Sequence, residues 1–193
     1  MKFKQYLTEK RKNNIIVVDI QPEYDNFFRF KLYNFCDLLN TNGKVLYFYN
    51  GPETVGGSNK NEIINWLIDN GLDYNKISDI KFIDKGYGFF RGWMDNGVDK
   101  RTIIKAIRYM VSKKVYDSRD IDEEEWEEKI KGIWNKADCD DNLYLPPEIR
   151  VDKLKKWSGS YLCGGGKTAC LLEIEILMNA FNIKYKEVKE FIY

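Results

Sequence analysis

Three residues of this 193-residue chain have side chains suited to nucleophilic and acid–base chemistry, and each follows a predicted strand. Asp19 ends the run NIIVVD, Lys85 follows DIKFID, and Cys170 follows SYLCGGGKTA. In open parallel sheets the ligand site lies beyond the carboxyl ends of the strands. We therefore expect the three side chains to meet at one edge of a sheet. Asp19 could then accept the thiol proton and Lys85 could stabilise the charges.

Cys170 is the most informative of the three. Its predicted place in the first turn of a helix favours the thiolate, because the helix dipole is positive there. The glycines before it would leave backbone N–H groups accessible to an oxyanion. The alternative is that Cys170 is a small buried hydrophobic residue on a core helix.

The sequence contains no histidine. This excludes Ser-His-Asp triads, Cys-His dyads and His-ligated zinc or iron. Any catalysis must use carboxylates, lysine, cysteine, tyrosine or a cofactor. We predict neither a cofactor nor a metal, since the acidic residues Asp138, Asp140 and Asp141 lack the spacing of a calcium loop.

Strands and helices alternate along the chain. Apolar, β-branched runs predict strands at 14–19, 44–49, 79–84 and 160–163, and an alternating pattern predicts an edge strand at 183–192. Helical spacing and end signals predict helices at 23–40, 58–69 (with Ser58 as N-cap), 99–113, from Asp120 or Asp122 onward, from Pro146 to Trp157, and 167–181. This order predicts the α/β class, as a three-layer α/β/α sandwich with a mostly parallel sheet.

Composition limits the partners and the location. Residues 1–193 read as one domain, with a helical insertion at 99–143. Lys and Arg number 31 against 30 Asp and Glu, so nothing favours nucleic acid or an anionic membrane as a partner. No signal peptide and no apolar run long enough to span a membrane is visible. Four scattered cysteines indicate reduced thiols, so we predict a cytoplasmic protein that binds a small molecule.

Other residues near the predicted strand ends could contact a substrate, although several of them, the aromatic ones above all, could equally belong to the core. They are Gln21, Tyr24, Asn50, Phe89, Phe90, Trp93, Gly164, Gly165 and Lys167. The segment GGGKT also suggests a phosphate-binding P-loop. That motif requires a glycine where this chain has Tyr161, which leaves anion binding at the helix start as the better alternative.

Three segments of the sequence resemble the isochorismatase-like cysteine hydrolases, a family that includes nicotinamidases. VVDIQPEY resembles the family's VVD-x-Q-x-x-F, with Tyr24 in the aromatic position. Lys85 and the GYGFF that follows it resemble the family's lysine segment. GGGKTACLLEIEILMNAFNIKYKEV is similar to its glycine-to-cysteine block, with Gly164 and Cys170 at the glycine and nucleophile positions. The resemblance covers about residues 14–94 and 144–192.

The resemblance implies an Asp-Lys-Cys triad that cleaves an amide-like C–N bond. Cys170 would attack the carbonyl, Asp19 would take the thiol proton, and Lys85 would orient and stabilise. The N–H groups of Gly166 and Cys170 would form the oxyanion hole. It also favours a homo-oligomer.

Two departures from the family pattern narrow this expectation. Lys167 replaces the threonine that lies three residues before the family's cysteine. Asn50-Gly51-Pro52-Glu53 replaces the Asp/His metal site of nicotinamidases, so a metal-independent enzyme is expected. The alternative is a non-catalytic module that has this fold and binds a small molecule or a protein. Such a module could be of viral origin. A hydrolase requires Cys170 Sγ within roughly 4–6 Å of both Asp19 and Lys85, and we expect iodoacetamide to alkylate it fast at neutral pH.

Overall fold

The structure is a computed structural model, and it describes residues 13–53, 57–86, 88–130, 143–145, 149 and 151–193. Five strands form one all-parallel sheet in the order β3-β2-β1-β4-β5. They are β1 (Ile15–Val18), β2 (Val45–Tyr49), β3 (Ile80–Asp84), β4 (Ser160–Gly164) and β5 (Tyr185–Glu187). The predicted α/β class with a parallel sheet is confirmed.

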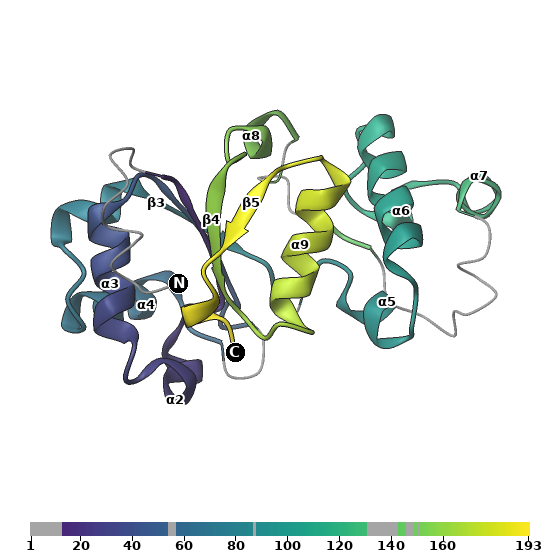
Figure 1. The fold of residues 1–193 in the computed structure, drawn as a ribbon. Helices are drawn as coiled ribbons and strands as arrows, with labels where there is room; N and C mark the ends of the chain where they lie inside the picture. The colour runs from purple at the N-terminus through teal and green to yellow at the C-terminus, as the bar shows by residue number, and fades with distance from the viewer. Residues whose placement is uncertain (1–12, 54–56, 87, 131–142, 146–148, 150) are drawn as a thin grey trace.

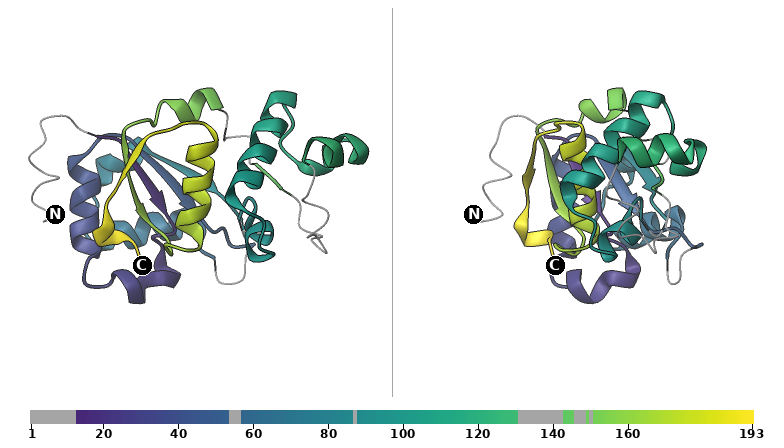
Figure 2. Two further views of the ribbon diagram at one scale, coloured as in Figure 1. Left: turned by 45° about the vertical axis from the view of Figure 1, so that its right-hand side comes forward. Right: turned by 90° about the vertical axis from the view of Figure 1, so that its right-hand side faces the viewer.

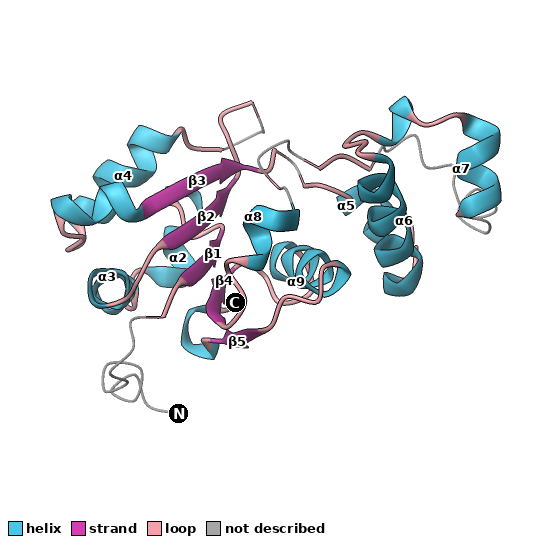
Figure 3. Ribbon diagram, turned by 90° about the horizontal axis from the view of Figure 1, so that it is seen from above, coloured by secondary structure: helices cyan, strands magenta, loops and turns pink. Residues whose placement is uncertain are grey.

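Helices lie on both faces of this sheet (Figures 1 and 3). The α-helices are α2 (Asp25–Phe28), α3 (Leu32–Thr41), α4 (Lys60–Asp69), α5 (Arg91–Asp95), α6 (Lys100–Lys113), α7 (Glu123–Lys129), α8 (Val151–Lys155) and α9 (Cys170–Ala180). The 3-10 helices are η1 (Pro22–Tyr24), η2 (Tyr74–Asp79), η3 (Ser118–Asp120) and η5 (Lys189–Phe191).

Alternate residues of β1 belong to two separate cores. Ile15 and Val17 pack with α3 and α4 on one face, and Ile16 and Val18 pack with α9 on the other. All four are fully buried. Side chains of a strand alternate between the two faces, so a strand covered on both must be apolar at every position. The continuous run IIVV is therefore explained by the central place of β1 in a sheet with two covered faces.

The sheet order also decides where a ligand can bind. From β1 the chain adds β2 and β3 on one side, then returns to add β4 and β5 on the other. The loops after β1 and β4 therefore diverge, and the crevice between their carboxyl ends is where such folds bind ligands. Asp19 follows β1 at this point, and the glycine loop that leads to Cys170 follows β4.

Two of the predicted helix starts need correction. Asn59, not Ser58, caps α4, because its side chain accepts from the Asn61 and Glu62 amides while Glu62 accepts from the Asn59 amide. The Ser58 hydroxyl instead hydrogen-bonds the Glu23 carboxylate. The last predicted helix begins at Cys170 rather than at residue 167, although its end near Phe181 is confirmed.

The predicted helix at 23–40 is divided into η1, α2 and α3. Phe27 and Phe30, which lie within the predicted helix, are 55% and 96% exposed. Phe28 and Leu32 are buried instead. The break before α3 rotates the chain so that these two residues face the sheet.

The edge strand expected at 183–192 is also shorter than predicted. Only Tyr185–Glu187 pairs with β4, and η5 follows. Val188 and Phe191 are both fully buried against the α3 side of the sheet. In a strand these two positions would point to opposite faces, so the chain turns to bury both.

The segment at 99–143 is helical where the structure describes it. Asp99 caps α6, and Asp122 caps α7, one of the two alternatives predicted. Figure 2 places α6 beside α9, with α7 farther from the sheet. Ile103, Ile107 and Met110 of α6 are fully buried in the core shared with α9. Residues 131–142, with Asp138, Asp140 and Asp141, and the predicted helix start at 146–148 lie outside the described residues.

Within the described part of the chain, no helix is both long and apolar enough to cross a membrane.

Candidate active site

Asp19 and Lys85 form a buried ion pair at the carboxyl edge of the sheet. Lys85 Nζ lies 3.0 Å from Asp19 Oδ2, and the exposed fractions of the two side chains are 1% and 0%. Burial raises the pKa of Asp19, while the Lys85 ammonium acts against that shift. Both charges are removed from water, so each depends on the other for stabilisation.

Cys170 completes this group. Its thiol lies close enough to Asp19 and Lys85 for both of these charges to act on its pKa. The three residues predicted from separate strand ends therefore lie together. Cys170 is only partly buried, whereas the other described cysteines, Cys36 and Cys163, are fully buried. Cys139 lies outside the described residues.

The resting state of the thiol differs from that predicted from a helix start alone. Burial, and then the negative charge of Asp19, raise the pKa of Cys170 to about 12, although Lys85 lowers it. At neutral pH the sulfur therefore carries its proton. The dipole of one helix end is smaller than the combined effect of desolvation and an adjacent carboxylate.

Asp19 occupies a backbone conformation that few residue types accept. Its φ is 48°, in the left-handed region where Asp and Asn are the usual non-glycine residues. Its amide donates to the Phe48 carbonyl at 3.0 Å and so continues the pairing of β1 with β2. The turn after β1 therefore begins at Asp19 itself.

The glycine loop brings Cys170 to this carboxylate. Gly164 has a φ of 84°, and a Cβ there would lie 2.1 Å from the Val18 carbonyl oxygen. Gly165 is also left-handed, and a Cβ there would lie 2.9 Å from the Leu171 amide. Both glycines thus allow the loop to fold closely over β1 and the start of α9. Their positions indicate a backbone role.

The oxyanion hole expected at the N–H groups of Gly166 and Cys170 stays a prediction. The neighbouring Lys167 amide is already used, since it donates to the Tyr193 carbonyl at 2.8 Å, and the Lys167 side chain is exposed.

Tyr24 and Asn50 lie at the border of the site. Burial, and then the charges of Asp19 and Cys170, raise the pKa of Tyr24, which places its phenol near the reactive group. Asn50 Nδ2 donates to the Tyr24 hydroxyl at 3.0 Å. Asn50 Oδ1 is buried and lacks a hydrogen-bond partner within the described residues. Both residues remain candidates for substrate contact.

Gln21 connects two strand ends. Its side-chain oxygen accepts from the Asn50 amide at 2.9 Å, and its Nε2 donates to Glu23 at 2.8 Å and to the Asn50 carbonyl at 3.3 Å. It is fully buried. These bonds hold the loop after β1 against the loop after β2.

The aromatic candidates of the loop after β3 lie in the core. Phe89 and Phe90 are each 1% exposed, and the Phe89 ring meets Phe48 edge-on at 6.0 Å. Trp93 is 4% exposed and lies 6.0 Å from Trp126 of α7. Their burial favours the core alternative for all three, and a contact with substrate stays a prediction.

Two residues at the site were not found from the sequence. Glu173, one turn after Cys170, is 1% exposed and accepts from the Phe89 and Phe90 amides. A charged residue within the apolar run CLLEIEILM was the available signal. Tyr193 stacks on Phe27 at 4.4 Å, and the charges of Asp19 and Cys170 contribute, after burial, to raising its pKa. No sequence pattern indicated Tyr193.

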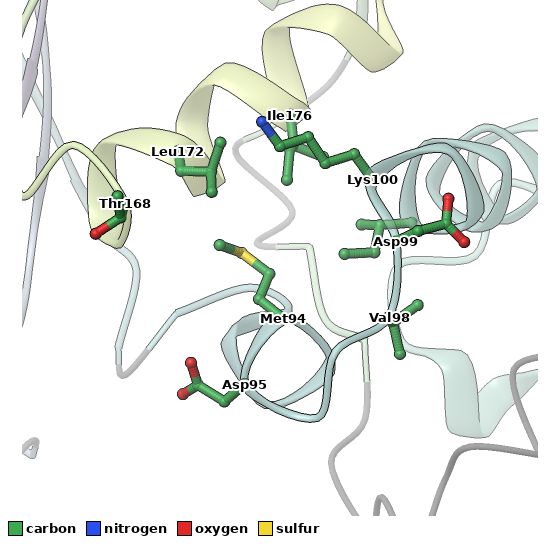
Figure 4. A pocket seen from close by; sticks show the side chains of 9 residues that line it. Met94, Asp95, Val98, Asp99, Lys100, Thr168, Leu172 and Ile176 are labelled. Atoms are coloured by element: carbon green, nitrogen blue, oxygen red, sulfur yellow. The ribbon is translucent and has the colours of Figure 1, made fainter.

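A separate hollow of about 380 Å³ lies on the other side of α9 (Figure 4). It is bordered by α5, the start of α6, and the face of α9 that carries Leu172 and Ile176. At 100° per residue, Leu172 lies about 160° and Ile176 about 120° from Cys170 around α9. Met94 and Lys100 extend toward these two side chains. The hollow therefore opens mainly on a face of α9 other than that of Cys170, although Thr168, two residues before Cys170, also lines it.

Within the described residues, no three His, Cys, Asp or Glu side chains form a group that could hold a metal ion. A scan against protein-family models finds no match to the chain, and neither does a search of curated proteins or one of solved structures.

Proposed function

We propose that this chain is an isochorismatase-like cysteine hydrolase that cleaves an amide-like C–N bond of a small molecule. One observation carries the proposal. A thiol, a carboxylate and an ammonium from three separate strand ends meet at the switch point of a parallel sheet. A buried charged pair costs free energy to maintain, and its place beside an accessible cysteine favours a catalytic role over a structural one.

The reaction follows from the resting protonation state. As Cys170 Sγ attacks the carbonyl carbon, its proton passes to Asp19, and the new oxyanion accepts hydrogen bonds from the amides of Gly166 and Cys170. The C–N bond then breaks, the proton on Asp19 moves to the leaving nitrogen, and a thioester remains on Cys170. Water attacks the thioester with Asp19 again as base, which releases the acid and restores the thiol.

Lys85 keeps Asp19 ready for this step. Its ammonium counteracts the rise that burial causes in the pKa of Asp19. It also lowers the pKa of Cys170. A high thiol pKa at rest is compatible with this scheme, because the proton leaves during the attack rather than before it.

The test is intact-mass spectrometry after incubation with a panel of primary and secondary amides. A hydrolase gives an acid-trapped adduct equal to the substrate less its amine, which peptide mapping places on Cys170, together with release of free amine. Cys170→Ala abolishes both. If the wild-type protein forms no adduct and releases no amine with any amide, the hydrolase proposal fails.

The raised thiol pKa favours a second candidate, a module that retains the fold and binds a small molecule without turnover. In that case a ligand from the same panel binds equally well to wild type and Cys170→Ala in calorimetry, and no acyl adduct forms.

A further inference from the structure

We infer that Glu173 is a positioning residue of this active site, which fixes the loop carrying Lys85 to the helix carrying Cys170. The inference rests on the proposed function, because such positioning matters when Cys170 reacts. It follows from the contacts of a buried carboxylate that the hydrolytic scheme does not use.

The contacts of Glu173 join two separate parts of the site. Its Oε1 accepts hydrogen bonds from the consecutive amides of Phe89, at 2.5 Å, and Phe90, at 2.9 Å. The acceptor belongs to α9, three residues after Cys170, and the donors belong to the loop that follows Lys85. Two amides directed at one carboxylate oxygen form a small anion-binding turn.

The loop is shaped to reach this carboxylate. Gly88 has a φ of 137°, and a Cβ there would lie 2.8 Å from Glu173 Oε1. The Gly88 amide donates to the Lys85 carbonyl at 3.0 Å. Hydrogen bonds therefore connect the Glu173 carboxylate to the Phe89 and Phe90 amides, and the Gly88 amide to the Lys85 carbonyl. The buried Phe89 and Phe90 rings hold the opposite side of the loop in the core.

The charge of Glu173 adds to this geometric role. Burial raises the pKa of Glu173, while Lys85 and the two amides counteract that shift. Lys85 thus lies among two carboxylates and one thiol. When Glu173 is ionised, its charge opposes loss of the Cys170 proton, in the same direction as Asp19.

The titratable and charged groups that face Cys170 come from each surrounding element. Removing the Glu173 charge changes one of several contributions to the pKa of Cys170, so a matched control must separate its effect from the others. The groups are Asp19 after β1, Tyr24 of η1, Lys85 after β3, Arg91 of α5, Glu173 of α9 and Tyr193 after η5.

Glu173→Gln is the decisive variant. A glutamine oxygen can accept from both amides, so the loop stays in place while the charge is lost. At a separation of roughly 7 Å and an effective dielectric constant of about 20, loss of a like charge lowers the thiol pKa by at most about 1.7 units. We therefore expect iodoacetamide to alkylate Cys170 about three- to tenfold faster than in wild type. The alkylation rate is followed by peptide mapping between pH 6 and 9.

Glu175→Gln is the matched control. Glu175 lies on the same helix and undergoes the same chemical change, but it interacts with Glu187, Tyr185 and Lys100 rather than with Cys170. Its alkylation rate should equal that of wild type. An unchanged rate in Glu173→Gln, or an equal acceleration in Glu175→Gln, overturns the role assigned to the charge.

Hydrogen exchange tests the geometric part. The Phe89 and Phe90 amides should stay protected from exchange in Glu173→Gln and lose protection in Glu173→Ala. Equal protection in both variants would overturn the positioning role of Glu173. If Glu173→Ala does not fold, exposure of these amides in Glu173→Gln still contradicts it. If wild type forms an acyl-enzyme but Glu173→Gln leaves the alkylation rate of Cys170 unchanged, this inference alone is refuted. If Glu173→Gln raises the alkylation rate of Cys170 but wild type forms no acyl-enzyme, the hydrolase proposal alone is refuted.

Discussion

Replacing Asp19 with asparagine should make Cys170 more reactive toward iodoacetamide while making the protein a poorer hydrolase. Asparagine has nearly the same shape and also tolerates the left-handed backbone of this position, whose φ is 48°. The substitution therefore removes the charge and the base with little effect on the turn. The Lys85 ammonium, no longer paired with a carboxylate, then stabilises the thiolate.

The size of the effect follows from the contact between the thiol and Asp19. A unit charge at roughly 4 Å in a medium of effective dielectric constant about 20 is worth about 4 kcal/mol, or about three pKa units at most. A thiolate of lower pKa is also less nucleophilic, by about half a power of ten per unit. For a fall of one to three units, the alkylation rate at pH 7.5 therefore rises about 3-fold to 30-fold. Loss of the base lowers turnover by roughly 10²–10⁴.

The assay is a time course of iodoacetamide labelling, with peptide mapping to assign the label to Cys170. Asp84→Asn is the control, because Asp84 directly precedes Lys85 yet its carboxylate binds the amides of Gly51 and Gly86. Its labelling rate should match wild type within twofold. Slower or unchanged labelling in Asp19→Asn would show that Asp19 does not suppress ionisation of the thiol, and the electrostatic reasoning would be wrong.

Three further outcomes follow from burial and backbone geometry. Lys85→Met should lower the free energy of unfolding in urea by about 3–5 kcal/mol, because it leaves a buried carboxylate unpaired. Lys113→Met, at a solvent-exposed ion pair with Glu125, should leave the free energy of unfolding nearly unchanged, and equal losses in the two variants would contradict the role of the buried pair. Gly164→Ala should cost about 2–5 kcal/mol from left-handed strain and collision with β1. Gly159 has a φ of 88°, but a Cβ built there has no atom within 4 Å, so Gly159→Ala should cost only the backbone strain, about 1–2 kcal/mol. A comparable cost at both sites would show that collision of the new Cβ in Gly164→Ala with β1 adds nothing. Because burial raises the pKa of Cys170 from 9.0 to about 12, the folded state keeps this proton after the unfolded state has lost it, so stability falls from pH 9 to 12 by at most about 1.4 kcal/mol per pH unit. Urea titrations of Cys170→Ala should show a shallower fall, and an identical slope would contradict the raised pKa.

Much of the fold follows from the sequence because the strands are continuous apolar runs. IIVV, VLYFY and SYLCG predict strands buried on both faces, and each occupies an interior position of the sheet. The pattern at 183–192 predicted the extent of its strand less well, because an alternating pattern reports burial on one face only. After β5, the burial of Val188 and Phe191 outweighs continued strand pairing.

The candidate triad was predictable because parallel strands bring their carboxyl ends to one edge. Its protonation state was not, since the pKa of Cys170 depends on burial and on neighbouring charges that only the folded chain brings together. Glu173 was missed for a related reason. An acidic residue on an apolar helix has meaning only when its partners are known, and those are backbone amides about 84 residues away.

The central position of β1 has a consequence for how the site forms during folding. β1 pairs with β2 across a separation of about 30 residues, but its pairing with β4, as at Val17 and Cys163, closes a loop of nearly 150 residues. Closing a loop costs more entropy as it lengthens, and pairings distant in sequence slow folding. The carboxylate and the ammonium can therefore meet within β1, β2 and β3 before the thiol arrives. The Cys170 thiol would then join a carboxylate and an ammonium that are already in place.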